Sequence, residues 1–242
     1  MEEIIRQIND RRFISDIEFD EEDGKIKLWS KRSKYKISIP KKVDERISYL
    51  CGVLLGDGNI NVGKKHINYP RMRIRIFNKS KSFLENVNKE FLDIFNVCGK
   101  LTKKKDKNCY ILTIHRRIVV IYFLKIIGLS SGKKINLVIP KMLRNREFFK
   151  YFLAGLYDTD GFKTDTFGIM MQGSNYEFLK NIINLLNRFY GVKSRKLYYG
   201  TIKTPFGIRS RCQFHIKSES MDKFINIIPL RHNRWILDGP VV

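Results

Sequence analysis

Apolar and polar residues alternate in two stretches of the chain, residues 71–77 and 209–217. Because side chains point to opposite faces at every second residue of a strand, this alternation predicts two strands that each have one apolar and one polar face. The apolar rows are Met72, Ile74 and Ile76 in the first strand and Cys212, Phe214 and Ile216 in the second. Each strand is therefore expected to lie in a sheet that is covered on one side only.

The hydrophobic pattern repeats itself from Ile47 onward. Segment 49–58 resembles segment 152–161, and the later pairs 82–87 with 177–182 and 122–129 with 223–230 keep similar offsets. Each copy reads as helix, two strands, amphipathic helix, two strands and helix. We therefore predict an α+β fold of two pseudo-symmetric αββαββα repeats, residues 47–150 and 151–242, with helices on one face of each sheet.

Residues 1–46 lie outside the repeats and are predicted to form a small N-terminal α+β extension. The pattern predicts a helix over 2–12 and strands over 13–19, 25–29 and 35–39, with an acidic turn at 20–24. This segment carries 12 basic and 11 acidic side chains, so it is nearly neutral. A structural cap is the expected role.

The charge of the chain lies almost entirely in the repeats. The 242 residues include 47 Lys and Arg against 24 Asp and Glu, a formal charge of +23, and residues 47–242 carry +22 of it. Since 43% of the residues are hydrophobic, a folded core is expected in spite of this charge. A basic excess of this size favours a nucleic acid partner over a small acidic substrate or a membrane surface.

The remaining composition excludes several classes of site. No apolar stretch approaches the length of a membrane span, and the first residues do not read as a signal peptide, so a cytoplasmic protein is expected. The four cysteines, Cys51, Cys98, Cys109 and Cys212, include no C-x-x-C pair. Free thiols are therefore expected, with neither a zinc site nor a disulfide framework.

Two helical segments end in Asp-Gly, at Asp57 and Asp160. One such ending alone would be an ordinary helix C-cap, but here each helix also has small residues four apart, Gly52 and Gly56 in one and Gly155 and Thr159 in the other. Small residues at this spacing allow two helices to approach closely, which would bring both carboxylates together. Paired carboxylates repel, and a divalent metal such as Mg²⁺ would offset that repulsion and support phosphodiester hydrolysis.

These two segments resemble the paired motifs of the LAGLIDADG homing endonucleases in their single-chain form with two repeats. The resemblance covers about residues 47–242 and implies two αββαββα halves whose sheets form a saddle over DNA. It also implies that the final acid of each motif, Asp57 or Asp160, binds the metal, with Gly56 and Thr159 beside them in the metal site. The motif's earlier acid is kept as Asp158 in the second copy and replaced by Leu55 in the first.

The same resemblance implies further catalytic residues. A polar residue ends the second strand of each repeat near the metal-bound water, and Asn78 and Gln172 fall at that point. A basic residue near the end of each repeat organises solvent or offsets charge, and Lys134 or the adjacent Lys133 matches it in the first repeat. Arg234 matches it in the second repeat, where lysine is more usual. Simple phosphate contact is the alternative role for these basic residues.

Candidate DNA-binding residues follow from the polar rows of the strands and from nearby basic segments. We expect contacts with phosphates or base edges from Arg71, Arg73, Arg75, Lys79, Lys103, Lys104, Lys163, Arg195, Lys196, Arg209, Arg211, Gln213 and His215. A single strand of this kind is usually a solvated sheet face. Two in equivalent places in a basic chain favour a nucleic-acid platform.

The sequence thus favours a monomeric, site-specific DNA endonuclease that uses Mg²⁺, for which Mn²⁺ can substitute. It is expected to cut both strands of a long, asymmetric double-stranded target and to leave short 3′ overhangs. Two alternatives stay open, an intron RNA maturase and a DNA-binding regulator without catalytic activity. The chain lacks an intein-like Cys or Ser start and a His-Asn end, so a free-standing protein is expected rather than a splicing fusion.

Overall fold

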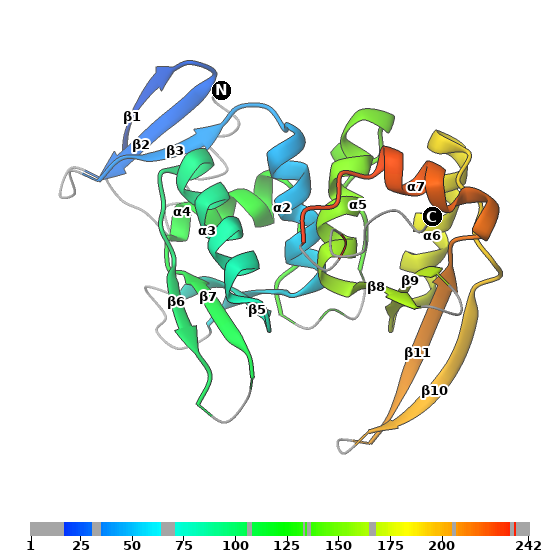
Figure 1. The fold of residues 1–242 in the computed structure, drawn as a ribbon. Coiled ribbons are helices and arrows are strands. Elements are labelled where there is room, and N and C mark those ends of the chain that lie inside the picture. The colour runs from blue at the N-terminus through cyan, green and yellow to red at the C-terminus, as the bar shows by residue number, and fades with distance from the viewer. Residues whose placement is uncertain are drawn as a thin grey trace.

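The computed structural model describes residues 17–30, 35–63, 71–105, 108–132, 134, 137–164, 168–204, 207–232 and 235. Within these ranges the chain forms a small N-terminal sheet followed by two halves of similar design, as Figure 1 shows. The halves meet along two central helices, and each half extends a β-hairpin toward the same side of the molecule (Figure 1). The mixed two-repeat fold predicted from the sequence is therefore confirmed.

The two halves contain matching elements in the same order. The first consists of α2 (Glu45–Gly56), β4 (Gly58–Val62), β5 (Met72–Asn78), α3 (Lys81–Phe95), β6 (Lys100–Lys103), β7 (Tyr110–Ile114), and α4 (Arg117–Ile121) with its π-helical continuation η1 (Tyr122–Ile126). The second consists of α5 (Arg146–Asp160), β8 (Gly161–Thr164), β9 (Gly168–Gly173), α6 (Tyr176–Tyr190), β10 (Tyr198–Thr204), β11 (Gly207–His215) and α7 (Met221–Ile227). Short 3₁₀ turns, η2 (Lys141–Leu143) and η3 (Ser218–Ser220), precede α5 and α7. The first helices of the halves begin at Glu45 and Arg146, slightly before the expected boundaries at 47 and 151.

Both halves use the same sheet topology. The strand orders are β4-β5-β7-β6 and β8-β9-β11-β10, and neighbouring strands in both sheets pair antiparallel. The alternation predicted from the sequence is confirmed, because Met72, Ile74, Ile76, Cys212, Phe214 and Ile216 are all buried. These side chains face the helices, so the opposite face of each sheet carries the polar row. The expectation that the two strands occupy equivalent places is wrong, because β5 is the second strand of its repeat and β11 is the fourth.

Local capping explains why four helices begin where they do. The side chains of Asp44, Ser80, Asn145 and Asn175 each accept a hydrogen bond from the backbone N–H three residues later, which satisfies a donor that the helix itself cannot pair. Helices α3 and α6 both end at a left-handed residue, Asn96 and Gly191. The two repeats thus share their N-capping and C-capping interactions although their sequences have diverged.

Helices α2 and α5 pack against each other backbone to backbone. A Cβ atom at Gly52 would collide with the carbonyl oxygen of Phe152, and one at Gly155 would collide with that of Tyr49. A Cβ at Gly56 would likewise collide with the side chain of Thr159. The predicted contact through small residues is confirmed, and it places the C-terminal ends of both helices next to each other.

The N-terminal sheet has the strand order β1-β2-β3, from β1 (Ile17–Glu22), β2 (Lys25–Ser30) and β3 (Ile37–Pro40). The predicted acidic turn at 20–24 is wrong, because β1 continues to Glu22 and only Asp23 and Gly24 form the turn. Both turn residues have positive φ, 48° and 73°, as a tight two-residue hairpin requires. The helix expected at 2–12 lies outside the described residues.

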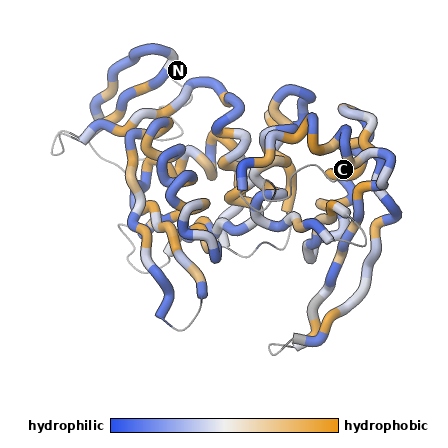
Figure 2. The backbone as a smooth tube through the Cα atoms, viewed as in Figure 1, coloured by the Kyte–Doolittle hydropathy of each residue, from blue (hydrophilic) through white to orange (hydrophobic). Residues whose placement is uncertain are grey.

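This sheet is attached to the first repeat by polar contacts around α3. Asn96 Nδ2 donates to the Lys36 carbonyl at 3.0 Å, and the Lys25 ammonium of β2 donates to the Asp93 carbonyl at 3.2 Å. Hydrophobic positions gather where helices meet one another and the sheets, whereas the β1–β2 turn is hydrophilic (Figure 2). Among the described residues, no helix is both long enough and apolar enough to cross a membrane.

Candidate active site and nucleic-acid interface

The two motif carboxylates sit at the ends of the paired central helices. Asp57 is the C-cap of α2, and Asp160 is the last residue of α5. Both residues are partly exposed, as are Gly56 and Thr159 before them, whereas the preceding Leu55 and Asp158 are buried. The close approach of the helices therefore brings two acids to one place in the middle of the molecule.

An open cavity of about 620 Å³ adjoins Asp57 and is shared by both repeats. Its lining includes Asp57, Asn78 and Lys79 from the first repeat and Thr159 and His232 from the second. The Asn78 amide Nδ2 donates a hydrogen bond of 2.7 Å to Asp57 Oδ2, and Asn78 Oδ1 accepts one from the Ser80 N–H at 2.8 Å. Asn78 is thus fixed at the end of β5 and orients the Asp57 carboxylate.

Lys134 lies against the end of α2, where its positive charge interacts with both Asp57 and Asp160. Its Nζ donates to the carbonyl oxygen of Leu55 at 2.8 Å and also to that of Gly56. Burial lowers the pKa of Lys134, while the charges of Asp160 and Asp57 oppose that lowering. An ammonium at the negative end of a helix offsets both the helix dipole and the neighbouring acids. The adjacent Lys133 and the second-repeat Arg234 lie outside the described residues.

The donor set at this place fits a magnesium ion. Asp57 and Asp160 supply hard carboxylate oxygens at the ends of adjoining helices, with Gly56 and Thr159 directly before them in the chain. Within the described ranges, no group of three or more His, Cys, Asp or Glu side chains could hold a metal. A metal here would complete its shell with water and phosphate oxygens, as Mg²⁺ commonly does.

Asp158, the earlier acid of the second motif, has a structural position. It is fully buried, and its Oδ2 accepts hydrogen bonds of 2.9 Å from the Tyr49 hydroxyl and from the Arg231 N–H. Burial, followed by the nearby Asp158 charge, raises the pKa of Tyr49, so this hydroxyl stays a donor. Leu55 occupies the matching place in the first repeat and is buried as an apolar residue.

Strand register shows that Asn78 and Gln172 are not equivalent. Gly58 pairs with Ile76 in the first sheet, and Gly161 pairs with Met171 in the second, so the counterpart of Asn78 is Gly173. Gln172 instead lies opposite Gln213 on the open face of its sheet. The prediction that Asn78 and Gln172 occupy equivalent positions is therefore wrong by one residue. The sequence shows only that each residue lies near the end of a strand.

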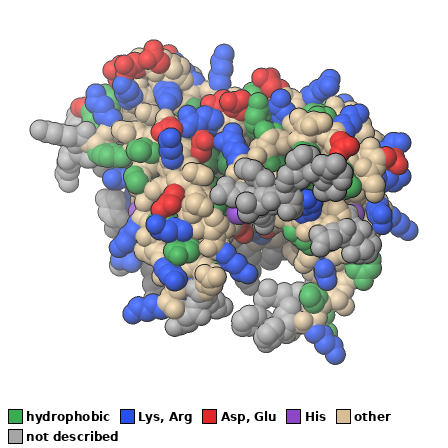
Figure 3. Space-filling view, in the orientation of Figure 1, with side chains coloured by type: hydrophobic (Ala, Val, Ile, Leu, Met, Phe, Trp, Pro, Cys, Tyr) green, Lys and Arg blue, Asp and Glu red, His purple; other side chains and the backbone are tan. Residues whose placement is uncertain are grey.

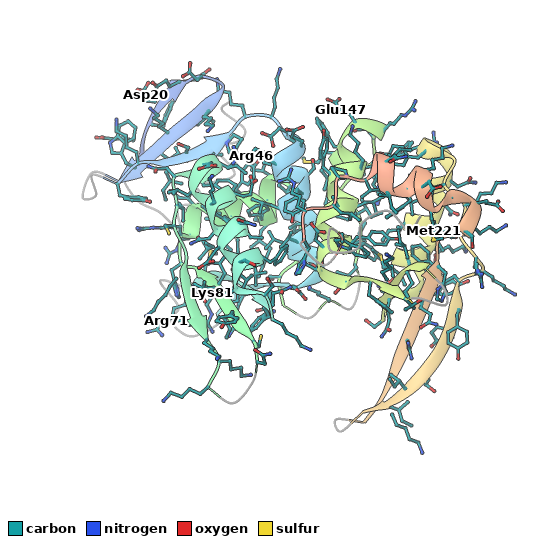
Figure 4. All side chains as sticks on the ribbon, in the orientation of Figure 1. Asp20, Arg46, Arg71, Lys81, Glu147 and Met221 are labelled. Atoms are coloured by element: carbon teal, nitrogen blue, oxygen red, sulfur yellow. The ribbon has the colours of Figure 1, made fainter. Side chains whose placement is uncertain are left out.

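The open face of the first sheet carries Arg73 and Arg75 opposite Asn61 and Asn59. The second carries Gln172 and Gln213, with His215 and Arg211 further along β11. Figure 3 shows Lys and Arg over the hairpins and acids over the N-terminal sheet, and in Figure 4 Asp20 lies on the N-terminal sheet at the top whereas Arg71 lies low in the first half. The structure thus separates the acidic strand β1 from the basic sheets.

Other candidate DNA contacts differ in their placement. Lys79 lines the central cavity, and Lys104, Arg195 and Lys196 are exposed outside the strands. Register places Lys103 on the face of Leu101, and Lys163 on the face of Ile169, which is the helix-covered side. Arg209 lies on β11 opposite Ile202. Binding by any of these residues stays a prediction.

Sequence reasoning missed residues on the outer strands. Lys100 pairs with Thr113 and so shares the open face with Arg75, and Tyr198 pairs with Gln213 and is 57% exposed. The alternation in these strands is a weak indication of this face. His232, which lines the central cavity, is far from Asp57 in sequence, and no local pattern indicates its role.

The paired helices and the two repeated sheets define a LAGLIDADG-type fold. Residues 44–128 match the family of LAGLIDADG-like domains. The structure resembles that of the homing endonuclease I-DmoI in complex with DNA and Mn, with a TM-score of 0.58 and 22% identity over 78% of this chain and 98% of that chain. It also resembles the homing endonuclease I-WcaI bound to its DNA recognition sequence, with a TM-score of 0.51 and 17% identity over 76% and 80% of the two chains. The chain contains a LAGLIDADG-like domain and has the two-repeat LAGLIDADG fold.

Two much longer proteins share part of the sequence. The chain is 30% identical over 146 residues to a component of the A-type ATP synthase of Pyrococcus abyssi. It is 29% identical over 158 residues to glutamine--fructose-6-phosphate aminotransferase [isomerizing] of Methanocaldococcus jannaschii. These matches cover 59% and 63% of this chain but only 13% of either relative. The activities in those names therefore do not transfer to this chain.

Proposed function

We propose that the chain is a divalent-metal-dependent DNA endonuclease that cuts both strands of a double-stranded target. The observation that carries the proposal is the position of Asp57 and Asp160 at the ends of the paired helices, with Lys134 interacting with both charges. This arrangement stands between two sheets whose open faces carry polar and basic residues. I-DmoI and I-WcaI, which share the fold, are described as homing endonucleases in complexes with DNA.

Asp57 and Asp160 would hold the metal, which we expect to be Mg²⁺, with Mn²⁺ as a substitute. The bound ion would supply Lewis-acid stabilisation of the scissile phosphate and activation of water. Asn78 keeps the Asp57 carboxylate in one orientation through its 2.7 Å hydrogen bond. Lys134 holds the end of α2 and reduces the repulsion between the acids.

The two sheets would each bind one half of an asymmetric target. Arg75 Nε and Gln213 Oε1 are buried with no hydrogen-bond partner among the described residues, and a base edge or phosphate would satisfy them. Because the open faces carry different side chains, one chain would read two different half-sites as a monomer. Cutting across the minor groove between them would leave short 3′ overhangs.

The decisive experiment is cleavage selection from a randomised duplex library with Mg²⁺, using the Asp57→Asn/Asp160→Asn double variant as the control. We expect the wild type to enrich one long asymmetric site and the control to enrich none. Selective duplex binding without cleavage in Mg²⁺ or Mn²⁺ would identify a regulator instead. Binding to RNA alone would identify a maturase.

A further inference from the structure

The segment that follows α7 returns to the centre of the molecule and is anchored there by Arg231. Its backbone N–H donates to the buried Asp158 at 2.9 Å, and its guanidinium donates to Glu90 at 3.0 Å. The same guanidinium lies over the Tyr49 ring, 4.2 Å from the ring centroid. Arg231 thereby fixes the C-terminal segment to α2, α3 and α5 at once.

This anchor determines the position of the next residue, His232. The His232 ring lies on Phe83 with the ring centroids 4.9 Å apart and the planes tilted by 32°. The backbone N–H of Trp235 donates to the His232 carbonyl at 3.0 Å. His232 also lines the open cavity that contains Asp57, Asn78 and Lys79. It is a second-repeat residue on the wall of a cavity whose polar groups come largely from the first.

We propose that His232 is a further active-site residue, whose imidazole donates a hydrogen bond to the DNA phosphate bound beside Asp57. This inference rests on the proposed function, since it needs a phosphate at that place. An imidazole has at least one N–H in either charge state, so the contact does not depend on titration. A hydrogen bond to a charged oxygen is stronger than one between neutral groups.

The alternative is that His232 only packs on Phe83, and substitution separates the two roles. His232→Phe keeps an aromatic ring against Phe83 and removes the N–H donors. His232→Gln keeps an N–H donor at similar reach and removes the ring. A packing role predicts that the Phe variant behaves as the wild type, whereas a phosphate contact predicts that the Gln variant retains more function.

The test measures affinity, so that it does not depend on cleavage. A duplex is first selected for binding by the Asp57→Asn/Asp160→Asn double variant, and each central phosphate is then replaced by a neutral methylphosphonate in turn. We expect His232→Phe in this background to lower affinity for the unmodified duplex about tenfold. The loss should vanish at one methylphosphonate position and persist at the others. His232→Gln should lose less affinity.

The control is His115→Phe, which changes an exposed histidine that follows β7 and should show no coupling to that central position. An equal effect of His232→Phe at every position, or no effect, would overturn the His232 contact even if the wild type cleaves DNA. If His232→Phe shows coupling at one position but the wild-type chain never cleaves the duplex, the result would support the His232 contact and overturn the proposed endonuclease activity. Failure of the chain to bind any duplex would overturn both.

Discussion

The two repeats have the same framework but differ around their motif acids. Asn78 donates to Asp57 in the first repeat, whereas the equivalent position in the second is Gly173, which has no side chain. The second repeat contributes His232, from its C-terminal segment, to the cavity at Asp57. Backbone geometry was therefore retained in both repeats while the groups around the two carboxylates diverged.

The open sheet faces differ in the same way. The first presents Arg73, Arg75 and Lys100, and the second presents two glutamines, Gln172 and Gln213, with Arg211 and His215 on the same strand. Arginine suits guanine edges and phosphates, whereas glutamine suits adenine edges. Under the proposed function, this difference would allow one chain to bind two unlike half-sites, which a symmetric dimer of one repeat could not read.

Replacement of either motif acid should have the largest effect on activity. Asp57→Asn or Asp160→Asn should lower cleavage on the order of a thousandfold, because each removes a charged metal ligand. Duplex affinity should hold or rise, since one of two repelling charges is lost. Single-turnover cleavage of each labelled strand, with binding measured in parallel, checks this. A variant that unfolds or loses binding would show that the acids are structural.

The unequal surroundings of the acids should appear as different kinds of defect. Asn78→Ala should slow cleavage by roughly ten- to a hundredfold with little change in affinity, because the Asp57 carboxylate loses its orienting partner. Gln172→Ala should weaken or broaden DNA recognition with little change in the rate of the bound complex. Rate and affinity are measured for both variants on one duplex. Equal reductions in cleavage rate for Asn78→Ala and Gln172→Ala would contradict this prediction and would indicate that the two residues have equivalent roles.

Much of this comparison could be predicted from the sequence because it depends on local patterns. The period-two rows predicted the buried Met72 and Phe214, and the glycine spacing predicted the contact of α2 with α5. Such patterns indicate burial and close backbone approach, and they can be recognised from residues that are near one another in the chain. The helices and strands of each repeat could therefore be predicted from that repeat's own sequence.

The unpredicted parts depend on register and on contacts between distant segments. Whether Asn78 aligns with Gln172 or Gly173 is decided by hydrogen-bonded pairing, and a slip of one residue reverses the face. The turn at Asp23 and Gly24 was placed too early for a similar reason, since β1 extends through polar residues. His232 reaches the cavity only because Arg231 is held by Asp158, which no local pattern indicates.

Single substitutions on the open faces should separate the two half-sites. Arg73→Ala and Arg75→Ala should affect one half-site, and Arg211→Ala and Gln213→Ala the other. Loss of a base contact should weaken binding by about 1–3 kcal/mol and relax sequence preference at one base pair. Loss of a phosphate contact should reduce by about one the slope of log affinity against log salt concentration. Stability should change by less than about 0.5 kcal/mol.

Affinity against salt concentration on half-site variants of the duplex checks this pattern. Lys180→Ala provides the control, because it removes an exposed charge from α6 in the helix layer. Loss of stability without any change in affinity or salt dependence would mean that the sheet faces were assigned in reverse. Equal effects of all four changes on both half-sites would remove the distinction between the repeats.

The smallest expected effect concerns Lys134, which supports the first repeat's helix end. Because burial lowers its pKa from 10.5, the unfolded chain binds more protons than the folded chain between the folded pKa and 10.5. The free energy of unfolding of the wild type should therefore rise with pH across that window relative to Lys134→Met, and level off above it. Denaturant unfolding of both proteins over an alkaline pH series measures the difference. A difference that falls with pH would mean that Asp57 and Asp160 stabilise the ammonium more than burial disfavours it.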